Sequence, residues 1–356
     1  MSEVRAKKAL GQHFLVDLNI ARKICDALSG GVRPEAGAET RANAAGYAGA
    51  GAEARTMAAG SADAGAETRA NAAGYAGAGA ETLTKATGTA DADAETRRSV
   101  AASADARLAA DTTAAGAPAA AEEERGGAVP CDVLEVGCGM GVLTQYLLRR
   151  GDITTYGAEI DPESVGYLHA HFPEFAPRLI EGDFLKMNLR ERFPRGLKII
   201  GNFPYNISSQ IFFKVLENRD LVPECVGMIQ KEVAVRIAEP PGSKEYGILS
   251  VLLQAWYDIE YLFTVNETVF NPPPKVKSAV IRLRRNSVGR LGCDEALFVK
   301  VVKASFGQRR KMIRNSLRAV FGDFGGAEHP FFTQRAEQLS VADFVQLTDW
   351  VAVNRK

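Results

Sequence analysis

Short runs of apolar residues alternate with amphipathic stretches along residues 128–285. The runs predict buried strands, and apolar positions three and four residues apart predict helices between them. The predicted strands are Val133–Val136, Ile153–Ile160, Arg178–Glu181, Leu197–Ile200, Val226–Ile229 and Ala279–Leu283. The predicted helices are Val142–Arg150, one beginning near Pro162 and one after Ser208–Ser209. Strands that alternate with helices indicate an α/β fold, with a mainly parallel sheet covered by helices on both faces.

The pattern changes after about Asn286, where only helical spacing remains. The predicted helices there are Leu297–Ala304, Arg310–Val320, Thr333–Gln338 and Val341–Val353. We therefore expect an α/β domain at residues 128–285, followed along the chain by a small all-α domain at residues 286–356.

Residues 35–127 contain almost no large apolar side chains and are dominated by Ala, Gly, Thr, Asp and Glu. The 18-residue sequence AGAETRANAAGYAGAGAE occurs at residues 36–53 and again unchanged at 64–81, a period of 28 residues. Repeats that stack need large apolar side chains, and Tyr47 and Tyr75 are nearly alone here. Such a composition cannot offset the entropy cost of ordering the chain. We expect a surface-loop insertion that arose by duplication and is disordered or transiently helical. A partner-binding role is the alternative, and the sequence specifies no partner.

The formal net charge of zero hides two parts of opposite sign. Residues 35–127 hold 8 basic and 14 acidic side chains, so the remaining 35 basic and 29 acidic residues give a net charge of +6. Lys275–Arg318 alone contains 13 Lys and Arg residues against Asp294 and Glu295. This density of positive charge favours a polyanionic partner, most simply a nucleic acid, although a solvated helix face gives the same pattern.

Composition excludes several classes of protein. The 356 residues are 46% hydrophobic and 24% charged, as in ordinary globular proteins. No apolar run approaches the roughly 18 residues of a membrane span. The basic residues Arg5, Lys7 and Lys8 are not followed by the apolar run of a secretory signal. Five separated cysteines without a C-x-x-C pair indicate neither disulfides nor zinc, so we expect a protein of the reducing cytoplasm without a metal.

A glycine-rich turn, GCGMG at residues 137–141, follows the first predicted strand. Glycines between a strand and a helix let the backbone approach a ligand, although an ordinary tight turn looks the same. The spacing G-x-G-x-G differs from the G-x-G-x-x-G of dinucleotide-binding proteins.

Acidic residues end the next two predicted strands. Glu159 lies 18 residues beyond Gly141, where a carboxylate can accept hydrogen bonds from both hydroxyls of a ribose. Its alternative role is a favourable charge at a helix start. Asp183 lies beside Phe184, where a carboxylate can accept the amino group of an adenine or can simply stabilise a turn.

The fourth predicted strand ends in Asn202-Phe203-Pro204-Tyr205. An exocyclic adenine amine is a poor nucleophile because its lone pair is delocalised into the ring. The Asn202 side-chain oxygen and a backbone carbonyl in the turn at Pro204 can accept its two N–H groups and favour a tetrahedral, positively charged nitrogen. Tyr205 offers a flat face for a base that has left its helix. An ordinary turn after a buried strand is the alternative.

Together these motifs resemble the class I S-adenosylmethionine-dependent methyltransferases that act on adenine N6, which have a Rossmann-like fold. Within them, the chain is similar to the bacterial family that dimethylates two adjacent adenosines near the 3′ end of small-subunit (16S) ribosomal RNA. The sequences that carry the resemblance are KKALGQHFL at 7–15, GNFPYNISS at 201–209, QKEVAVRI at 230–237, NPPPKVKSAV at 271–280 and FGQRRKMIRNSLR at 306–318. They cover the chain except residues 35–127, where that family has a short connection.

The resemblance implies roles for individual residues. Residues 1–34 would form a segment that covers the cofactor, S-adenosylmethionine. The cofactor-binding residues would be His13, Leu15, Gly137, Glu159, Asp183 and Asn202. The catalytic residues would be Asn202, Pro204 and Tyr205. His13 stands where the family often has Asn, and Phe203 where Leu is usual, which leaves their effect on mono- versus dimethylation open.

The basic FGQRRKMIRNSLR helix would lie beside the catalytic mouth and bind RNA. The implied substrate-binding residues are Phe306, as a second wall for the flipped base, Arg309, Arg310, Lys311 and Arg314. The implied partner is 16S ribosomal RNA in the immature small subunit. We expect a monomeric, cytoplasmic enzyme with a role in subunit biogenesis, independent of metals and membranes.

Other functions remain open from the sequence. A related methyltransferase of 23S ribosomal RNA would share the strand-end residues, but the FGQRRKMIRNSLR helix argues against it. A DNA adenine methyltransferase is weakened by the lack of an evident DNA-reading domain. The contrasting class is a non-catalytic RNA-binding assembly or transcription factor on the same fold, against which the intact Asn202–Tyr205 sequence argues.

Overall fold

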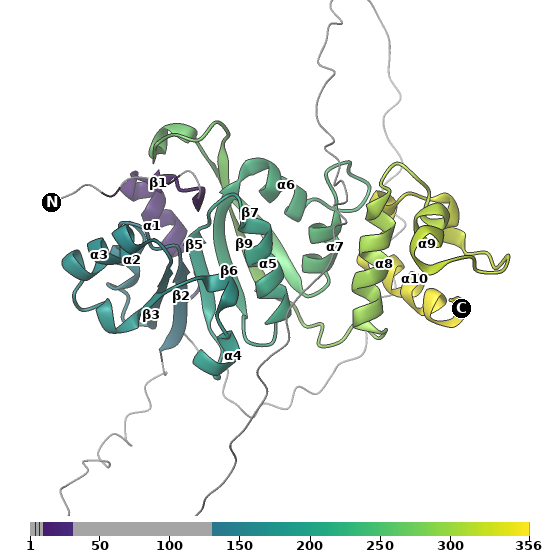
Figure 1. The fold of residues 1–356 in the computed structure, drawn as a ribbon, viewed down its shortest axis with the longest axis horizontal. Coiled ribbons are helices and arrows are strands. Elements are labelled where there is room, and N and C mark those ends of the chain that lie inside the picture. The colour runs from purple at the N-terminus through teal and green to yellow at the C-terminus, as the bar shows by residue number, and fades with distance from the viewer. Residues whose placement is uncertain (1–3, 5–6, 8–9, 31–129, 356) are drawn as a thin grey trace, which may run out of the picture. The chain divides into compact units, whose positions relative to one another are not determined.

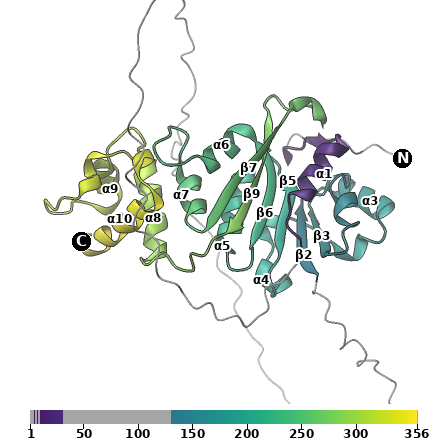
Figure 2. The same cartoon turned by 180° about the vertical axis from the view of Figure 1, so that it is seen from behind.

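A seven-stranded sheet with strand order β4-β3-β2-β5-β6-β9-β7 organises the fold (Figures 1 and 2). The computed structural model describes residues 4, 7, 10–30 and 130–355, and the predicted insertion at 35–127 lies outside the described residues. The strands are β2 (Cys131–Val136), β3 (Ile153–Glu159), β4 (Leu179–Glu181), β5 (Lys198–Asn202), β6 (Glu224–Gln230), β7 (Tyr257–Val265) and β9 (Ser278–Arg285). β2 to β6 pair in parallel, whereas β9 pairs antiparallel with β6 and β7, which confirms the mainly parallel α/β fold.

Alternate side chains of the strands enter two separate apolar cores. Val133, Ile200 and Val226 pack with helices α1 (Leu18–Asp26) and α2 (Thr144–Leu147) on one face. On the other face, strand residues pack with the helices that follow β4, β5 and β6. These helices are α4 (Leu189–Arg192), α5 (Ser208–Glu217), α6 (Lys231–Ala238) and α7 (Ile248–Gln254). The two-residue period of a strand therefore buries both faces of the sheet.

Several helices begin at side chains that accept hydrogen bonds from free backbone N–H groups. Asp161 caps α3 (Pro162–His171), whose first residue is a proline with a suitable fixed φ. Asp294 accepts the Leu297 N–H at the start of α8 (Glu295–Gly307). None of the helices in the described ranges is long and apolar enough to cross a bilayer.

The C-terminal elements are helical, as predicted. They are α8, α9 (Ile313–Phe321) and α10 (Val341–Asn354), and their apolar residues join the core that also contains α5, α6 and α7. A domain boundary near residue 286 stays a prediction, because this apolar core continues across it.

Three predicted helices differ from the structure. The helix predicted at Val142–Arg150 is regular only over α2 and is flanked by turns. The helix predicted from Arg310 begins at Ile313, because Met312 has an extended backbone (φ −66°, ψ 153°). The segment Thr333–Gln338 is not a helix: two short 3₁₀ turns are separated by extended residues at Gln334 and Arg335.

Helix α1 is fixed to the sheet at the amino ends of the parallel strands. Buried Lys198, the first residue of β5, donates to the carbonyls of Ser29 and Gly30 at 3.0 and 3.1 Å. Lys198 also pairs with buried Glu224, the first residue of β6, at 3.1 Å, and Glu224 accepts the Ser29 N–H. Arg150 binds the Leu28 carbonyl at 3.0 Å. Leu28, Ser29 and Gly30, at the end of the described N-terminal range, are therefore held at this edge of the sheet.

We expect Glu224→Ala to lower the free energy of unfolding by about 3–5 kcal/mol, because it leaves the buried Lys198 ammonium without its charged partner. Urea unfolding followed by circular dichroism measures the change. The double variant K198M/E224L should lose less than the two single variants together. Additive losses would show that the two side chains contribute independently.

Candidate active site

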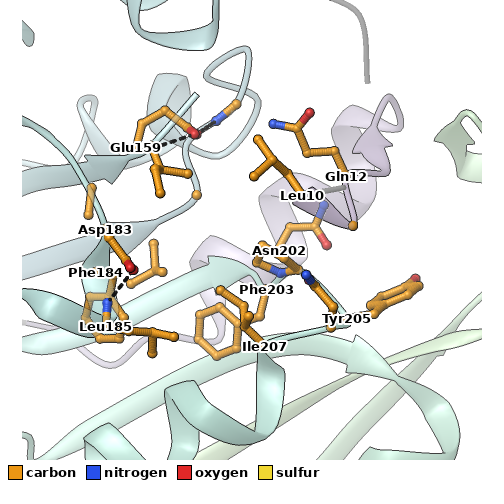
Figure 3. A pocket seen from close by; sticks show the side chains of 18 of the residues that line it. Leu10, Gln12, Glu159, Asp183, Phe184, Leu185, Asn202, Phe203, Tyr205 and Ile207 are labelled. Atoms are coloured by element: carbon orange, nitrogen blue, oxygen red, sulfur yellow. Dashed lines mark hydrogen bonds between the residues drawn. The ribbon is translucent and has the colours of Figure 1, made fainter. Parts of the chain in front are cut away.

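The polar residues that the sequence placed after the strands gather at one edge of the sheet, where the carboxyl ends of β2, β3, β4 and β5 meet. A cavity at this edge is formed by these strand ends together with Leu10–Phe14 (Figure 3). The predicted residues that line it are His13, Gly137, Glu159, Asp183, Asn202, Pro204 and Tyr205. Ligands bind at this edge in open α/β sheets because the connecting loops diverge there.

Residues Leu10–Leu15 form a segment that we call the N-terminal strap, and its residues Leu10–Phe14 line one side of the cavity. At its end, β1 (Phe14–Leu15) pairs with β8 (Phe270–Asn271), and Val16 N–H donates to the Val269 carbonyl at 2.9 Å. Gly11 has a φ of +63°, and a Cβ there would lie 2.5 Å from Asn206 Oδ1. A glycine is therefore required where the strap crosses the strand-end turn.

Glu159 is 4% exposed, and backbone N–H groups bind its carboxylate. Oε2 accepts from Gly139 N–H at 2.8 Å, and Oε1 accepts from Ile160 and Asp161 N–H at 2.9 Å each. Burial raises the pKa of this carboxyl, and the three N–H groups oppose the rise. A carboxylate has about four acceptor positions, so roughly one remains for a ligand hydroxyl.

Asp183 stabilises a turn and also lines the cavity. Its Oδ1 accepts the Leu185 N–H at 2.9 Å and stabilises the turn after β4. Its Oδ2 lies 4.0 Å from Lys186 Nζ, too far for a hydrogen bond. Asp183 lines the cavity beside the Phe184 and Leu185 side chains, so one carboxylate oxygen can still accept a donor from a flat, apolar ligand.

The Asn202 amide has a defined orientation. Its Nδ2 donates to the His13 main-chain carbonyl at 2.9 Å. Because a carbonyl can only accept, the –NH₂ group must face the strap, and Oδ1 is left to accept a hydrogen bond from a ligand. In Figure 3, Asn202 lies between Glu159 and Asp183 on one side and Tyr205 on the other. The nearby Pro204 carbonyl accepts the Ile207 N–H at 3.2 Å. One lone pair of this carbonyl oxygen is left to accept a second hydrogen bond.

Tyr205 is held from two sides. Its hydroxyl lies 2.5 Å from the hydroxyl of buried Ser278, and burial raises the pKa of the Tyr205 phenol. The His13 ring lies 5.3 Å from the Tyr205 ring, and His13 Nδ1 donates to the Pro272 carbonyl at 2.9 Å. His13 thus positions two cavity residues, Asn202 through its carbonyl and Tyr205 through its ring.

Two predicted site residues lie away from the cavity. Leu15 is 2% exposed because its side chain fills the apolar core beneath α1, so that side chain does not line the cavity, and a main-chain contact with the cofactor stays a prediction. Phe306 packs between Tyr246 and Phe344, with ring centroids 6.3 and 6.0 Å away. The Phe306 ring thus packs among the C-terminal helices and does not line this cavity, and its role beside a flipped base stays a prediction.

The four basic residues predicted to bind RNA fall into two groups. Arg309 donates to the carbonyls of Lys244 and Tyr246, and Arg314 pairs with Glu328. These guanidinium groups already have protein partners. Arg310 and Lys311 are exposed in the turn between α8 and α9 and have no charged partner among the described residues. Only the second pair is fully available to an anionic ligand.

Glu135 is a buried carboxyl behind the glycine turn, with no role assigned from the sequence. It is 2% exposed and accepts the Thr144 hydroxyl at 2.6 Å. Burial raises the pKa of Glu135 from 4.5 to about 8. Since Thr144 begins α2, this hydrogen bond ties the helix to β2 beside the cavity.

Sequence reasoning also missed residues of the strap and its contacts. Gln12 and Phe14 line the cavity, and Asp161 and Ser278 hold residues that do. Gln12 and Phe14 are the sequence neighbours of His13 in GQHFL. The prediction that His13 lies at the site could therefore have been extended to both of them. Among the residues described by the structure, no three His, Cys, Asp or Glu side chains gather as metal ligands.

The strand order and the cavity at the carboxyl edge define a class I methyltransferase fold. The family described as Ribosomal RNA adenine dimethylase matches residues 130–352. The chain is 59% identical over 221 residues to Ribosomal RNA small subunit methyltransferase A of Bacteroides thetaiotaomicron, covering 62% of this chain and 82% of that protein. It is 59% identical over 220 residues to the protein of that name from Porphyromonas gingivalis, covering 61% and 84%.

A solved structure of a dimethyladenosine transferase is also similar to this chain. The dimethyladenosine transferase of Plasmodium falciparum has a TM-score of 0.51 and 26% identity, covering 61% of this chain and 88% of that one. The chain belongs to the ribosomal RNA adenine dimethylase family.

We expect the stability of the wild-type protein to fall relative to Glu135→Gln as the pH rises from 5 to 8. A raised pKa means that the folded state keeps a proton that the unfolded chain releases, so this contribution is complete below about pH 4.5 and is lost toward pH 8. Glutamine keeps an acceptor for Thr144 without the proton. Urea unfolding at several pH values measures the difference, and a constant difference would contradict the assignment.

Proposed function

We propose that this protein is an S-adenosylmethionine-dependent methyltransferase that dimethylates the N6 amines of two adjacent adenosines near the 3′ end of small-subunit ribosomal RNA. The observation that carries the proposal is the orientation of Asn202, whose amide oxygen faces the cavity because its –NH₂ group is bound by the strap. Family membership and the names of the relatives supply the reaction class and the RNA.

The cavity has the chemistry to hold S-adenosylmethionine. Glu159 retains about one acceptor position for a ribose hydroxyl, and Asp183 retains one oxygen beside the apolar Phe184 for an adenine amine. Gly137 lines the cavity without a side chain. A Cβ added to Gly137 would lie 3.8 Å from Pro204 Cδ. When bound, the cofactor supplies an electrophilic methyl group.

The residues around Asn202 can activate an adenine amine without a metal or a covalent intermediate. Asn202 Oδ1 and the free lone pair of the Pro204 carbonyl can accept the two N–H groups of the base. This arrangement localises the nitrogen lone pair and stabilises the positive charge that develops on it. Tyr205, fixed by Ser278 and His13, offers the face on which the flipped base stacks.

Arg310 and Lys311 are the side chains we assign to the RNA backbone. They are exposed and retain their charge for phosphate, whereas Arg309 and Arg314 have a mainly structural role. The immature small subunit is the substrate that we propose, and the cytoplasm is the compartment in which the enzyme would meet it. The monomeric state stays a prediction.

Methyl transfer from tritiated S-adenosylmethionine tests the proposed function. Immature small subunits should be labelled, with two methyl groups on each of two adjacent adenosines by mass spectrometry. Label on large-subunit RNA or duplex DNA instead would overturn the proposed substrate. Absence of any label would favour a non-catalytic assembly or transcription factor.

We expect Asn202→Ala to lower kcat by about 100- to 1000-fold, the usual effect of removing one group that stabilises developing charge. RNA affinity should stay unchanged, because Asn202 lies away from the exposed basic pair. Single-turnover methylation and filter binding measure the two quantities. Asn19→Ala, an exposed asparagine on α1, is the matched control. Equal loss of binding and turnover would contradict this division.

We expect the double variant R310S/K311S to weaken RNA binding and to reduce the slope of log Kd against log salt by about two, since two phosphate contacts are lost. Titrations at several salt concentrations measure the slope. R192S/R195S removes two exposed arginines that precede β5 at the opposite edge of the sheet and is the matched control. An unchanged slope in R310S/K311S would show that the RNA follows another path.

A further inference from the structure

Asp161 connects the two sides of the cavity. Its side chain is fully buried, and its main-chain N–H binds Glu159 Oε1 at 2.9 Å. Its carboxylate pairs with Lys7 Nζ and accepts from Gln12 Nε2 at 3.4 Å. Lys7 in turn donates its main-chain N–H to Gln12 Oε1 at 2.8 Å. The residue that caps α3 therefore also binds the start of the strap.

The strap is held at two separate points. Its far end is fixed by the β1–β8 pairing and the Val16 hydrogen bond. Its near end is fixed by the Asp161 carboxylate through Lys7 and Gln12. His13, whose carbonyl binds Asn202 Nδ2, lies between these two points. Release of the near end would thus leave His13, which orients the Asn202 amide, held only by Pro272, Tyr205 and the far end of the strap.

We propose that Asp161 is a positioning residue that holds the N-terminal strap against the cavity and, through the His13 carbonyl, keeps the Asn202 amide in its reactive orientation. This inference rests on the proposed function for its effect on turnover, but not for its effect on the strap. Glu163 also approaches Lys7, at 3.1 Å, but its side chain is 52% exposed and has no contact with Gln12. Water screens such an exposed pair, so Asp161 is the residue that matters.

Asp161→Asn is the variant that separates the two roles of this residue. Asparagine caps helices as well as aspartate does, so α3 should be retained. The amide has a single acceptor oxygen and no charge, so it cannot hold the helix N–H and also pair with Lys7 and Gln12. Lys7→Met breaks the same contact from the strap side, whereas Lys7→Arg keeps the charge.

Hydrogen exchange of the cofactor-free protein tests the strap directly. In D161N and K7M we expect amide exchange to rise about tenfold at residues 10–13 and to stay unchanged at residues 14–16, which the β1–β8 pairing protects. E163Q is the matched control and should behave like wild type, as should K7R. Unchanged exchange at residues 10–13 in D161N would overturn the proposal, whatever the enzyme's activity.

Cofactor binding and turnover test the link to Asn202. We expect D161N to raise the Kd for S-adenosylhomocysteine about fivefold to tenfold by calorimetry and to lower kcat at saturating cofactor. A lower Tm with unchanged Kd and kcat would reduce Asp161 to a helix cap. If wild type neither binds the cofactor nor methylates RNA, the proposed function fails while the exchange result still decides the strap contact.

Discussion

A single hydrogen bond, from Asn202 Nδ2 to the His13 carbonyl, determines which end of the Asn202 amide faces the cavity. An asparagine amide has a donor end and an acceptor end of nearly equal shape, and only its partners determine which end faces a ligand. A main-chain carbonyl can bind only the –NH₂ end of the amide, because a carbonyl accepts hydrogen bonds and cannot donate them. The strap therefore does more than cover the cavity: it determines that an oxygen, and not an N–H group, of Asn202 faces the cavity.

The strands and the residues at their ends could be predicted because both follow from local patterns. Apolar runs gave the strands, and parallel strands bring their carboxyl ends to one edge, so Glu159, Asp183 and Asn202 converge as predicted. Helix ends were harder, since an extended residue such as Met312 or Gln334 interrupts an apolar period that otherwise continues. Strand β7 was missed because Tyr257–Tyr261 alternate apolar and polar residues, a pattern that differs from the apolar runs by which the other strands were predicted.

The rest of the site depends on contacts between residues far apart in the chain. Lys7 meets Asp161, His13 meets Pro272, and Tyr205 meets Ser278 only after folding. A resemblance can suggest that a residue such as Leu15 or Phe306 belongs to a site, but burial in a core decides what its side chain touches. The division of the basic residues into paired and available groups likewise required the positions of acidic and carbonyl partners.

The amino edge of the sheet is the place where the chain can vary in length. Gly30 and Pro130, which flank the long undescribed segment, both adjoin the first residues of parallel strands, on the side remote from the cavity. Lys198, Glu224 and Arg150 hold the chain firmly just before this point. A change in chain length between Gly30 and Pro130 therefore enters the domain at the edge opposite the cavity-lining residues.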